Sequence, residues 1–125
     1  MPGTASILVV DDEPVVRALL KAALAPAGSR VVEAADGSEA LDVAWREQPD
    51  LVLLDVGLPK LNGLDVCRAL KTNPVAPRVL LITGNADLPG LDDCGADGVV
   101  TKPFRPLELL ELVRRHLDAV ASAAA

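Results

Sequence analysis

The chain has 125 residues, half of them are apolar, and its formal net charge is −6. This length suits a single domain spanning residues 1–125, with a core over about 5–118 and a tail over 119–125. The acidic balance argues against nucleic acid as a direct partner, because binding to a phosphate backbone needs clustered Lys and Arg. No apolar stretch approaches the roughly 20 residues of a membrane span, and no basic segment with an apolar run forms a signal peptide, so we expect a cytoplasmic protein without a membrane partner.

Apolar runs and helical patterns alternate along the chain. The runs lack the polar alternation of half-exposed strands. Continuous aliphatic runs of this length are typical of strands that are covered on both faces of a parallel sheet. In chain order they predict strands over 7–10, 30–34, 51–54, 79–82 and 98–101.

Apolar residues at helical spacing predict helices between these runs. Pro14 suits the first turn of the first helix, and Pro26 and Gly28 are expected to end it. A second helix is expected over 38–47, and Asn62 is a suitable cap for the third.

The last part of the pattern is irregular. Between Thr83 and Lys102, Pro89-Gly90 lies where a fourth helix belongs, so this helix should be short, irregular or missing. A final amphipathic helix begins at Pro106, and the residues after Val120 should fray. Because parallel strands need crossover connections, the whole pattern predicts an α/β fold with a doubly wound five-stranded parallel sheet.

Polar residues stand at or just beyond the ends of four predicted strands. The C-terminal ends of parallel strands share one edge of the sheet, and ligands of open α/β sheets bind at that edge where the strand order reverses. Three of these residues are carboxylates, which repel one another unless something neutralises them, and an oxygen-only ligand set suits Mg²⁺. The group consists of Asp11, Asp12, Asp55, Thr83 and Lys102.

The chemistry of this group suits phosphoryl transfer. An aspartate such as Asp55 can attack phosphorus and form an acyl phosphate. Lys102 supplies a positive charge that can hold a phosphoryl oxygen, and the Thr83 hydroxyl can hydrogen-bond another. In the alternative with a purely structural role, Asp11 and Asp12 only cap the following helix and Asp55 only caps a loop.

Four of these residues, Asp11, Asp12, Asp55 and Lys102, belong to three motifs, which are ILVVDDEPVVR at 7–17, LLDVGLPKLNG at 53–63 and TKPF at 101–104. Together and in this order they resemble the receiver domain of two-component response regulators, the CheY-like family, over essentially the whole chain. The resemblance implies a flavodoxin-like sheet with strand order 2-1-3-4-5.

The resemblance also implies the roles of the acidic residues. Asp55 matches the phosphoacceptor, whose phosphoryl group comes from a phosphohistidine on a sensor histidine kinase or a phosphotransfer protein. The cofactor would be Mg²⁺, with Asp12, Asp55 and the backbone carbonyl of Gly57 as direct ligands and Asp11 acting through water.

The remaining matches lie at the ends of the last two strands. Lys102 matches the family lysine, and Thr83 matches the hydroxyl that moves toward the phosphate. The Lys102-Pro103 bond matches the family's cis peptide, which costs only about 0.5–1 kcal/mol before proline.

The chain departs from the family pattern in three ways. Val99 stands where receivers usually carry an aromatic residue that moves together with the threonine. The segment between Thr83 and Lys102 is about one helical turn shorter than is typical. Gly57 and Asn85 occupy the positions that tune hydrolysis of the phosphate.

We expect a stand-alone receiver that switches interactions with a downstream target protein, and not an enzyme beyond self-phosphorylation and self-dephosphorylation. Residues 88–100 and the last helix are the expected contact surface. A receiver-like module that works without phosphorylation remains an alternative, as does a receiver cut from a longer protein, although Met1 and the alanine tail favour a natural chain. A phosphatase with an aspartyl nucleophile is disfavoured, because Gly57 stands where it would need a second aspartate.

Other residues with reactive or bulky side chains receive ordinary structural interpretations. Cys67 and Cys94 form no metal-ligand pattern, and we expect two buried free thiols. Trp45 should pack on the face of its helix that also carries Leu41. His116, the single histidine, should face solvent.

Overall fold

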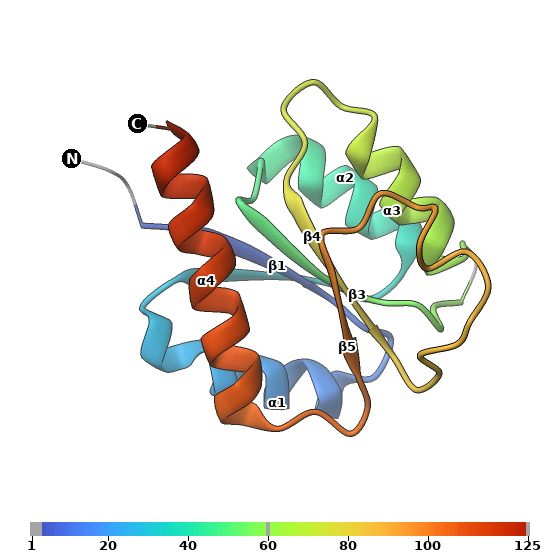
Figure 1. Cartoon of the computed structure of the whole chain (residues 1–125), viewed down its shortest axis with the longest axis horizontal. Coiled ribbons are helices and arrows are strands. Elements are labelled where there is room, and N and C mark those ends of the chain that lie inside the picture. Colours follow the sequence, from blue (N-terminus) through green and yellow to red (C-terminus); the bar gives the residue numbers. More distant parts are fainter. Residues whose placement is uncertain (1–3, 60, 125) are drawn as a thin grey trace.

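The computed structural model describes residues 4–59 and 61–124. A parallel sheet forms its centre, with the strands in the order β2-β1-β3-β4-β5 (Figure 1). The doubly wound α/β fold is therefore confirmed, and the strand order reverses next to β1. All five predicted strands are also confirmed, as β1 Ser6–Val10, β2 Arg30–Ala34, β3 Leu51–Asp55, β4 Arg78–Thr83 and β5 Gly98–Thr101.

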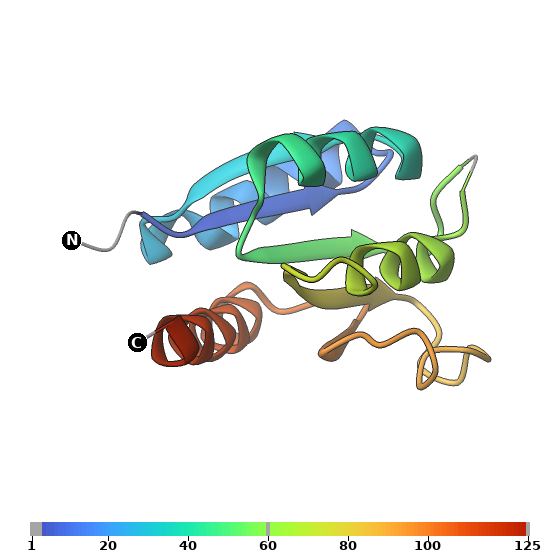
Figure 2. The ribbon, with the colours of Figure 1, turned by 90° about the horizontal axis from the view of Figure 1, so that it is seen from above.

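Helices cover both faces of this sheet. On one face α1 (Pro14–Leu24) packs beside α4 (Pro106–Ala124), and on the other α2 (Gly37–Glu47) packs beside α3 (Gly63–Lys71) (Figures 1 and 2). This arrangement explains why β1, β3 and β4 read as unbroken apolar runs, because their successive side chains enter opposite layers that are both closed to solvent.

Local sequence signals set the helix ends. Pro14 occupies the first turn of α1, which continues as a short 3₁₀ turn, Ala25–Ala27, until Gly28 with a φ of 70° ends it. Asn62 caps α3 as predicted, since its Oδ1 accepts a hydrogen bond from the backbone N–H of Leu64 at 2.7 Å.

The core consists of two aliphatic layers separated by the sheet. The layer beneath α1 and α4 contains Ile7, Val9, Leu20, Leu24, Leu51, Leu53, Leu80, Ile82, Leu109 and Val113. The layer beneath α2 and α3 includes Leu8, Val10, Ala40, Val43, Val52, Leu54, Val66, Cys67, Leu70, Val79 and Leu81. The central strands contribute to both layers, so the sheet edge that carries the polar residues is rigidly supported.

Residues 84–97, between β4 and β5, contain turns but no helix, as the sequence predicted (Figure 2). Gly90 and Gly95 adopt φ values of 94° and 86°, in the left-handed region that interrupts a right-handed helix. Leu91 and Cys94 are buried and dock this segment in the layer beneath α2 and α3. The segment is therefore irregular in backbone but anchored by its side chains.

Both cysteines are buried free thiols, as predicted. The Cys67 Sγ lies 3.4 Å from the backbone carbonyl oxygen of Cys94, so α3 contacts the irregular segment directly. Burial, followed by the neighbouring Cys94 thiol, raises the pKa of the Cys67 thiol to about 12. A thiol with that pKa stays protonated at neutral pH and serves as packing.

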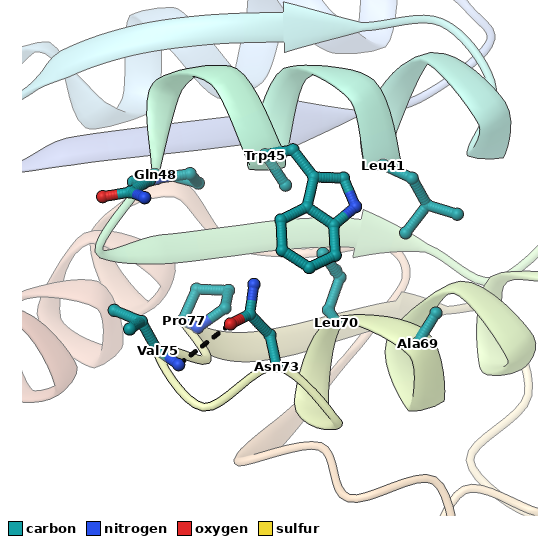
Figure 3. Close-up of a pocket in the computed structure, with 10 residues that line it drawn as sticks. Leu41, Trp45, Gln48, Ala69, Leu70, Asn73, Val75 and Pro77 are labelled. Atoms are coloured by element: carbon teal, nitrogen blue, oxygen red, sulfur yellow. Dashed lines mark hydrogen bonds between the residues drawn. The ribbon is translucent and has the colours of Figure 1, made fainter.

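Trp45 shares one side of α2 with Leu41, as predicted, but this side of the helix does not enter the core. Ala40 and Val43 form the deepest face of α2, while Leu41 lies only partly buried and 61% of Trp45 is exposed. The indole lies over a cleft between α2 and α3 (Figure 3). The geometry of the helix explains this exposure. Trp45 stands two positions beyond Val43, and a rotation of about 100° per residue turns it about 200° away from the core.

The prediction that His116 faces solvent is wrong. His116 is half-buried on α4, and its Nδ1 lies 3.2 Å from Nη1 of Arg78 at the start of β4. Because a guanidinium can only donate, Nδ1 accepts this hydrogen bond and the imidazole is neutral.

The last helix is longer than predicted. It continues through Ala124 instead of fraying after Val120, which agrees with alanine having the highest helix propensity. Residue 125 lies outside the described residues. Within the described part of the chain, none of the helices combines the length and apolar character needed to cross a membrane.

Candidate functional site

The parallel strands carry the predicted polar residues to one edge of the sheet. Asp55 is the last residue of β3 and Thr83 the last of β4, while Asp11-Asp12 follows β1 directly and Lys102 follows β5. Since β1, β3, β4 and β5 are neighbours in that order, these side chains gather from four adjacent strand ends.

Three carboxylates form the acidic part of the site. One oxygen each of Asp11, Asp12 and Asp55 lies within 4.8 Å of the others. Asp11 and Asp55 are buried, whereas Asp12 is exposed. Burial is the main cause that raises the pKa of Asp11, and the negative charges of Asp55 and Asp12 raise it further. The three carboxylates therefore repel one another, and burial reduces the solvation that would offset their negative charge.

The hydrogen bonding of Asp11 tests whether a cation fits here. Its Oδ1 accepts a hydrogen bond from the backbone N–H of Glu13 at 2.9 Å. Its Oδ2 is buried and has no hydrogen-bond partner among the described residues. A buried carboxylate oxygen without a partner is costly, and a divalent cation would satisfy it. Oxygen donors from three carboxylates suit Mg²⁺, so the residues present fit this ion.

Asp55 is fixed at both of its oxygens. Oδ1 accepts a hydrogen bond from the backbone N–H of Gly57 at 3.0 Å, and Oδ2 pairs with the Lys102 Nζ at 3.4 Å. Although Asp55 is buried, it lines an opening at the sheet edge together with Asp12, Asn62 and other residues of the surrounding loops. The carboxylate is thus oriented, paired with a cation and accessible.

The Thr83 hydroxyl is engaged by its own loop. Its Oγ1 accepts a hydrogen bond from the backbone N–H of Asn85 at 3.0 Å and donates to the Asn85 carbonyl at 3.3 Å. The backbone N–H of Lys102 donates to the Thr83 carbonyl at 2.8 Å, which ties the end of β4 to the residue after β5. The predicted cis Lys102-Pro103 bond is present. Thr83 therefore links the site to the first residues of the irregular segment.

Gly63, in the motif at 53–63, packs directly against the backbone of Asp55 and Val56. A Cβ at this position would lie 2.6 Å from the Val56 Cα and 2.7 Å from the Asp55 carbonyl oxygen. The backbone N–H of Gly63 also donates to the Val56 carbonyl at 3.2 Å. Only glycine permits this close contact between the start of α3 and the end of β3.

Sequence reasoning missed Arg17 and Glu33. The Arg17 Nη1 donates to the backbone carbonyl of Asp11 at 2.6 Å, and its Nε donates to Glu33 at 3.2 Å. Arg17 is the last residue of the motif at 7–17 and lies one helical turn after Glu13, a spacing that aims it back at the strand end. Glu33 could not be found locally, because β2 is brought next to β1 only by the fold.

Val99, in place of the usual aromatic residue, pairs with Leu81 in the sheet, and 41% of it is exposed. No aromatic side chain is available at this position of β5, so any movement of Thr83 must be transmitted by other contacts.

Comparison with known proteins places these observations in a family. The family model described as the response regulator receiver domain matches residues 7–114. The chain is 43% identical over 113 residues to the DNA-binding response regulator MtrA of Mycolicibacterium smegmatis, covering 89% of this chain and 50% of MtrA. It is 44% identical over 115 residues to the alkaline phosphatase synthesis transcriptional regulatory protein PhoP of Bacillus subtilis, covering 89% of this chain and 48% of PhoP. The chain spans about half the length of these curated relatives.

A solved structure of similar length gives the same result. The chemotaxis response regulator CheY4 of Vibrio cholerae is 30% identical, and its structure superposes with a TM-score of 0.85 over 91% of this chain and 99% of that chain. Because the family model covers most of the sequence and the structure reproduces the fold, the chain belongs to the response regulator receiver domain family, the signalling switches of two-component phosphorelays.

Proposed function

We propose that Asp55 accepts a phosphoryl group from a phosphohistidine of a sensor histidine kinase or phosphotransfer protein. The observation that carries this proposal is the group of residues around Asp55, where one carboxylate oxygen pairs with Lys102 and the clustered Asp11 has a buried Oδ2 without a hydrogen-bond partner among the described residues. Asp11, Asp12, Asp55 and the backbone carbonyl of Gly57 would hold Mg²⁺. When bound, this ion offsets the negative charge on the transferring phosphoryl oxygens.

The reaction is a displacement at phosphorus. A carboxylate oxygen of Asp55 forms a bond to phosphorus while the bond from phosphorus to the donor imidazole nitrogen breaks, and the electron pair leaves with the imidazole. The backbone N–H of Gly57 holds the carboxylate in position. Lys102 then pairs with a phosphoryl oxygen in place of the free Asp55 carboxylate, and the Thr83 hydroxyl donates to another.

The output is a change of surface. When the Thr83 hydroxyl turns to the phosphate, it gives up its two hydrogen bonds with Asn85, and residues 84–97 lose one of their anchors. Phosphorylation thereby shifts an equilibrium between two arrangements of this segment, to the extent that the phosphoryl group favours one of them. The contact surface for a downstream target protein is formed by residues 88–100 and α4.

We further propose that the chain works as a single stand-alone receiver domain without direct contact to nucleic acid. The net charge of −6 supports the absence of a nucleic-acid contact, because a phosphate backbone needs clustered Lys and Arg, and the superposition of 91% of this chain on CheY4 supports one receiver domain within these 125 residues. Its catalysis would be limited to its own phosphorylation and dephosphorylation. A receiver that binds partners without phosphorylation is favoured by Val99 and by the missing helix over residues 84–97.

The decisive experiment is incubation with Mg²⁺ and acetyl phosphate, followed by intact-mass and peptide mass spectrometry. We expect one phosphate adduct on the wild type and none on Asp55→Asn. Asp42→Asn, which removes an exposed carboxylate from α2, is the matched control and should be phosphorylated normally. A wild type that takes up no phosphate would support the unphosphorylated alternative, and an adduct on Asp55→Asn would place the acceptor elsewhere.

A further inference from the structure

Arg17 is a charged side chain beside the carboxylate cluster that takes no part in the proposed phosphoryl transfer. It lies in α1, and only 17% of its side chain is exposed. Its Nη1 donates to the backbone carbonyl of Asp11 at 2.6 Å, while its Nε donates to Glu33 Oε1 at 3.2 Å. One planar guanidinium therefore connects the residue after β1 with α1 and β2.

The contact with Arg17 completes the fixation of Asp11. The backbone N–H of Asp11 donates to the Ala34 carbonyl at 3.2 Å, its carbonyl accepts from Arg17, and its Oδ1 accepts from the backbone N–H of Glu13. Oδ2 is the remaining hydrogen-bonding atom, and it has no partner among the described residues. Within the described residues, Asp11 is thus held at each of its polar groups except Oδ2, and its carboxylate belongs to the acidic cluster.

Glu33 holds the guanidinium in turn. Its Oε2 accepts a hydrogen bond from Lys21 Nζ at 3.1 Å. The hydrogen bonds from Lys21 and from Arg17 lower the pKa of Glu33, so this carboxylate is ionised at neutral pH. The two cations bind different oxygens of one carboxylate, which leaves the guanidinium little freedom to turn away from Asp11.

We propose that Arg17 is a positioning residue of the metal site. By holding the Asp11 carbonyl it fixes the peptide between Asp11 and Asp12, and it thereby presents the Asp11 Oδ2 and the exposed Asp12 carboxylate together to a divalent cation. The inference rests on the proposed function, since it concerns the Mg²⁺ site. Mg²⁺ demands near-octahedral geometry, so a ligand pair that is held in advance binds it more tightly than a mobile one.

The affinity for Mg²⁺, measured by isothermal titration calorimetry on the full chain, tests this proposal. Arg17→Met keeps the aliphatic stem and removes all donors, and we expect it to lower the affinity roughly 10–100-fold, as is usual for groups that orient metal ligands. Arg17→Lys should fall between this variant and the wild type, because one ammonium cannot reproduce the fork that reaches both Asp11 and Glu33.

The matched control is Lys71→Met at the other edge of the sheet. It removes the ion pair with Asp97 and the hydrogen bond to the Pro77 carbonyl, so it lowers stability without touching Asp11. Its Mg²⁺ affinity should equal that of the wild type. A loss of affinity in Arg17→Met that Lys71→Met shares would assign Arg17 a merely structural role and overturn the proposal.

A second readout needs no metal. Nuclear magnetic relaxation of the Asp12 amide in the metal-free protein should show lower order in Arg17→Met and unchanged order in Lys71→Met. Wild-type affinity in Arg17→Met together with an equally ordered Asp12 would overturn the proposal.

Two further outcomes are also decisive. If Arg17→Met does not fold, Arg17→Lys and Glu33→Gln replace it, and wild-type affinity in both would overturn the proposal. If the wild type itself binds no Mg²⁺, the proposed metal site fails, while the relaxation experiment still tests whether Arg17 holds the Asp12 peptide.

Discussion

At the scale of single residues, the hydrogen-bond and ion-pair partners of each carboxylate shape the site. Asp55 is oriented by the Gly57 N–H and paired with Lys102, whereas one oxygen of buried Asp11 has no hydrogen-bond partner in the part of the chain that the structure describes. An unsatisfied buried oxygen lowers the stability of the metal-free protein and raises its affinity for a cation. The same atom therefore connects stability with function.

Asp11→Asn should stabilise the metal-free protein, because it removes one of three neighbouring negative charges and leaves an amide that can donate to the other carboxylates. Urea unfolding in EDTA should show a higher midpoint than the wild type. In excess Mg²⁺ the order should reverse, since the wild type gains about 2.7 kcal/mol at a hundred times Kd while the variant lacks a ligand. Asp42→Asn should change neither midpoint. A variant that is less stable than the wild type in EDTA would contradict the predicted repulsion between the three carboxylates.

His116 should make the protein less stable at mildly acidic pH. Burial, followed by the positive charge of Arg78, lowers the pKa of His116 below 6.5. As the pH falls below about 6.5, the imidazole of the unfolded chain therefore binds a proton before that of the folded protein does. The stability that is present above about pH 6.5 is lost as the pH falls through the lowered pKa. His116→Gln keeps an acceptor for Arg78 and should reduce this loss, which urea unfolding near pH 8 and near pH 5 would measure. Since His116 is the single histidine, a proton NMR titration gives its pKa directly, and a value at or above 6.5 would contradict the prediction.

At the scale of elements, the start of α3 is pressed against the end of β3. Gly63 makes this possible, and Asn62 caps the helix at the same place. The element that follows the acceptor strand therefore fixes the backbone of Asp55 and Val56 from one side. The irregular segment 84–97 lines the same opening and is anchored by buried side chains and by the hydrogen bond from the Asp97 N–H to the Val79 carbonyl.

Gly63→Ala should destabilise the protein by about 1–3 kcal/mol, because the new methyl group would overlap the Val56 Cα and the Asp55 carbonyl. The displaced strand end should also slow phosphorylation by acetyl phosphate. Gly84→Ala is the matched control at the same sheet edge, where a Cβ meets nothing within 4 Å, and it should be nearly neutral in urea unfolding. Equal stability of the two variants would show that the α3 contact is not tight.

At the scale of the whole molecule, the C-terminal and N-terminal ends of the strands carry different groups of polar residues. The C-terminal edge carries the carboxylates, Thr83 and Lys102. The opposite edge carries the Lys71–Asp97 pair, which joins α3 to the residue before β5, and the Arg78–His116 hydrogen bond, which joins β4 to α4. Trp45, near the C-terminal end of α2, lies toward this second edge over the cleft with Pro77 (Figure 3).

The fluorescence of Trp45 should therefore report unfolding but not metal binding. Its emission should be that of a largely exposed indole and should not change when Mg²⁺ is added to the folded protein. The unfolding curve followed by the same signal should nevertheless move to higher urea in Mg²⁺, because binding to the folded state stabilises the domain as a whole. A quench of Trp45 on adding Mg²⁺ to the folded protein would show that the two edges are coupled.

Much of this structure could be predicted from the sequence because the strongest signals are local. The five aliphatic runs became the five strands, Asn62 became a cap, and the two glycines at positions 90 and 95 prevent a helix where Pro89-Gly90 had marked a break. The failures concern orientation. His116 lies at the border of the buried face of α4, where a rotation of one position decides between core and surface, and Trp45 lies on the side of α2 that is turned away from the core.

The sequence by itself determined the fold class, the strand-end position of Asp11, Asp12, Asp55, Thr83 and Lys102, and the absence of a regular helix over 84–97, because each depends on residues that are close together in the chain. Only the tertiary structure decided which polar atoms have hydrogen-bond partners: that Asp11 Oδ2 has none among the described residues, that Arg17 holds the Asp11 carbonyl, and that Glu33 on β2 holds Arg17. These contacts join β1, α1 and β2, and such partners cannot be read along the chain because packing, not spacing, brings them together.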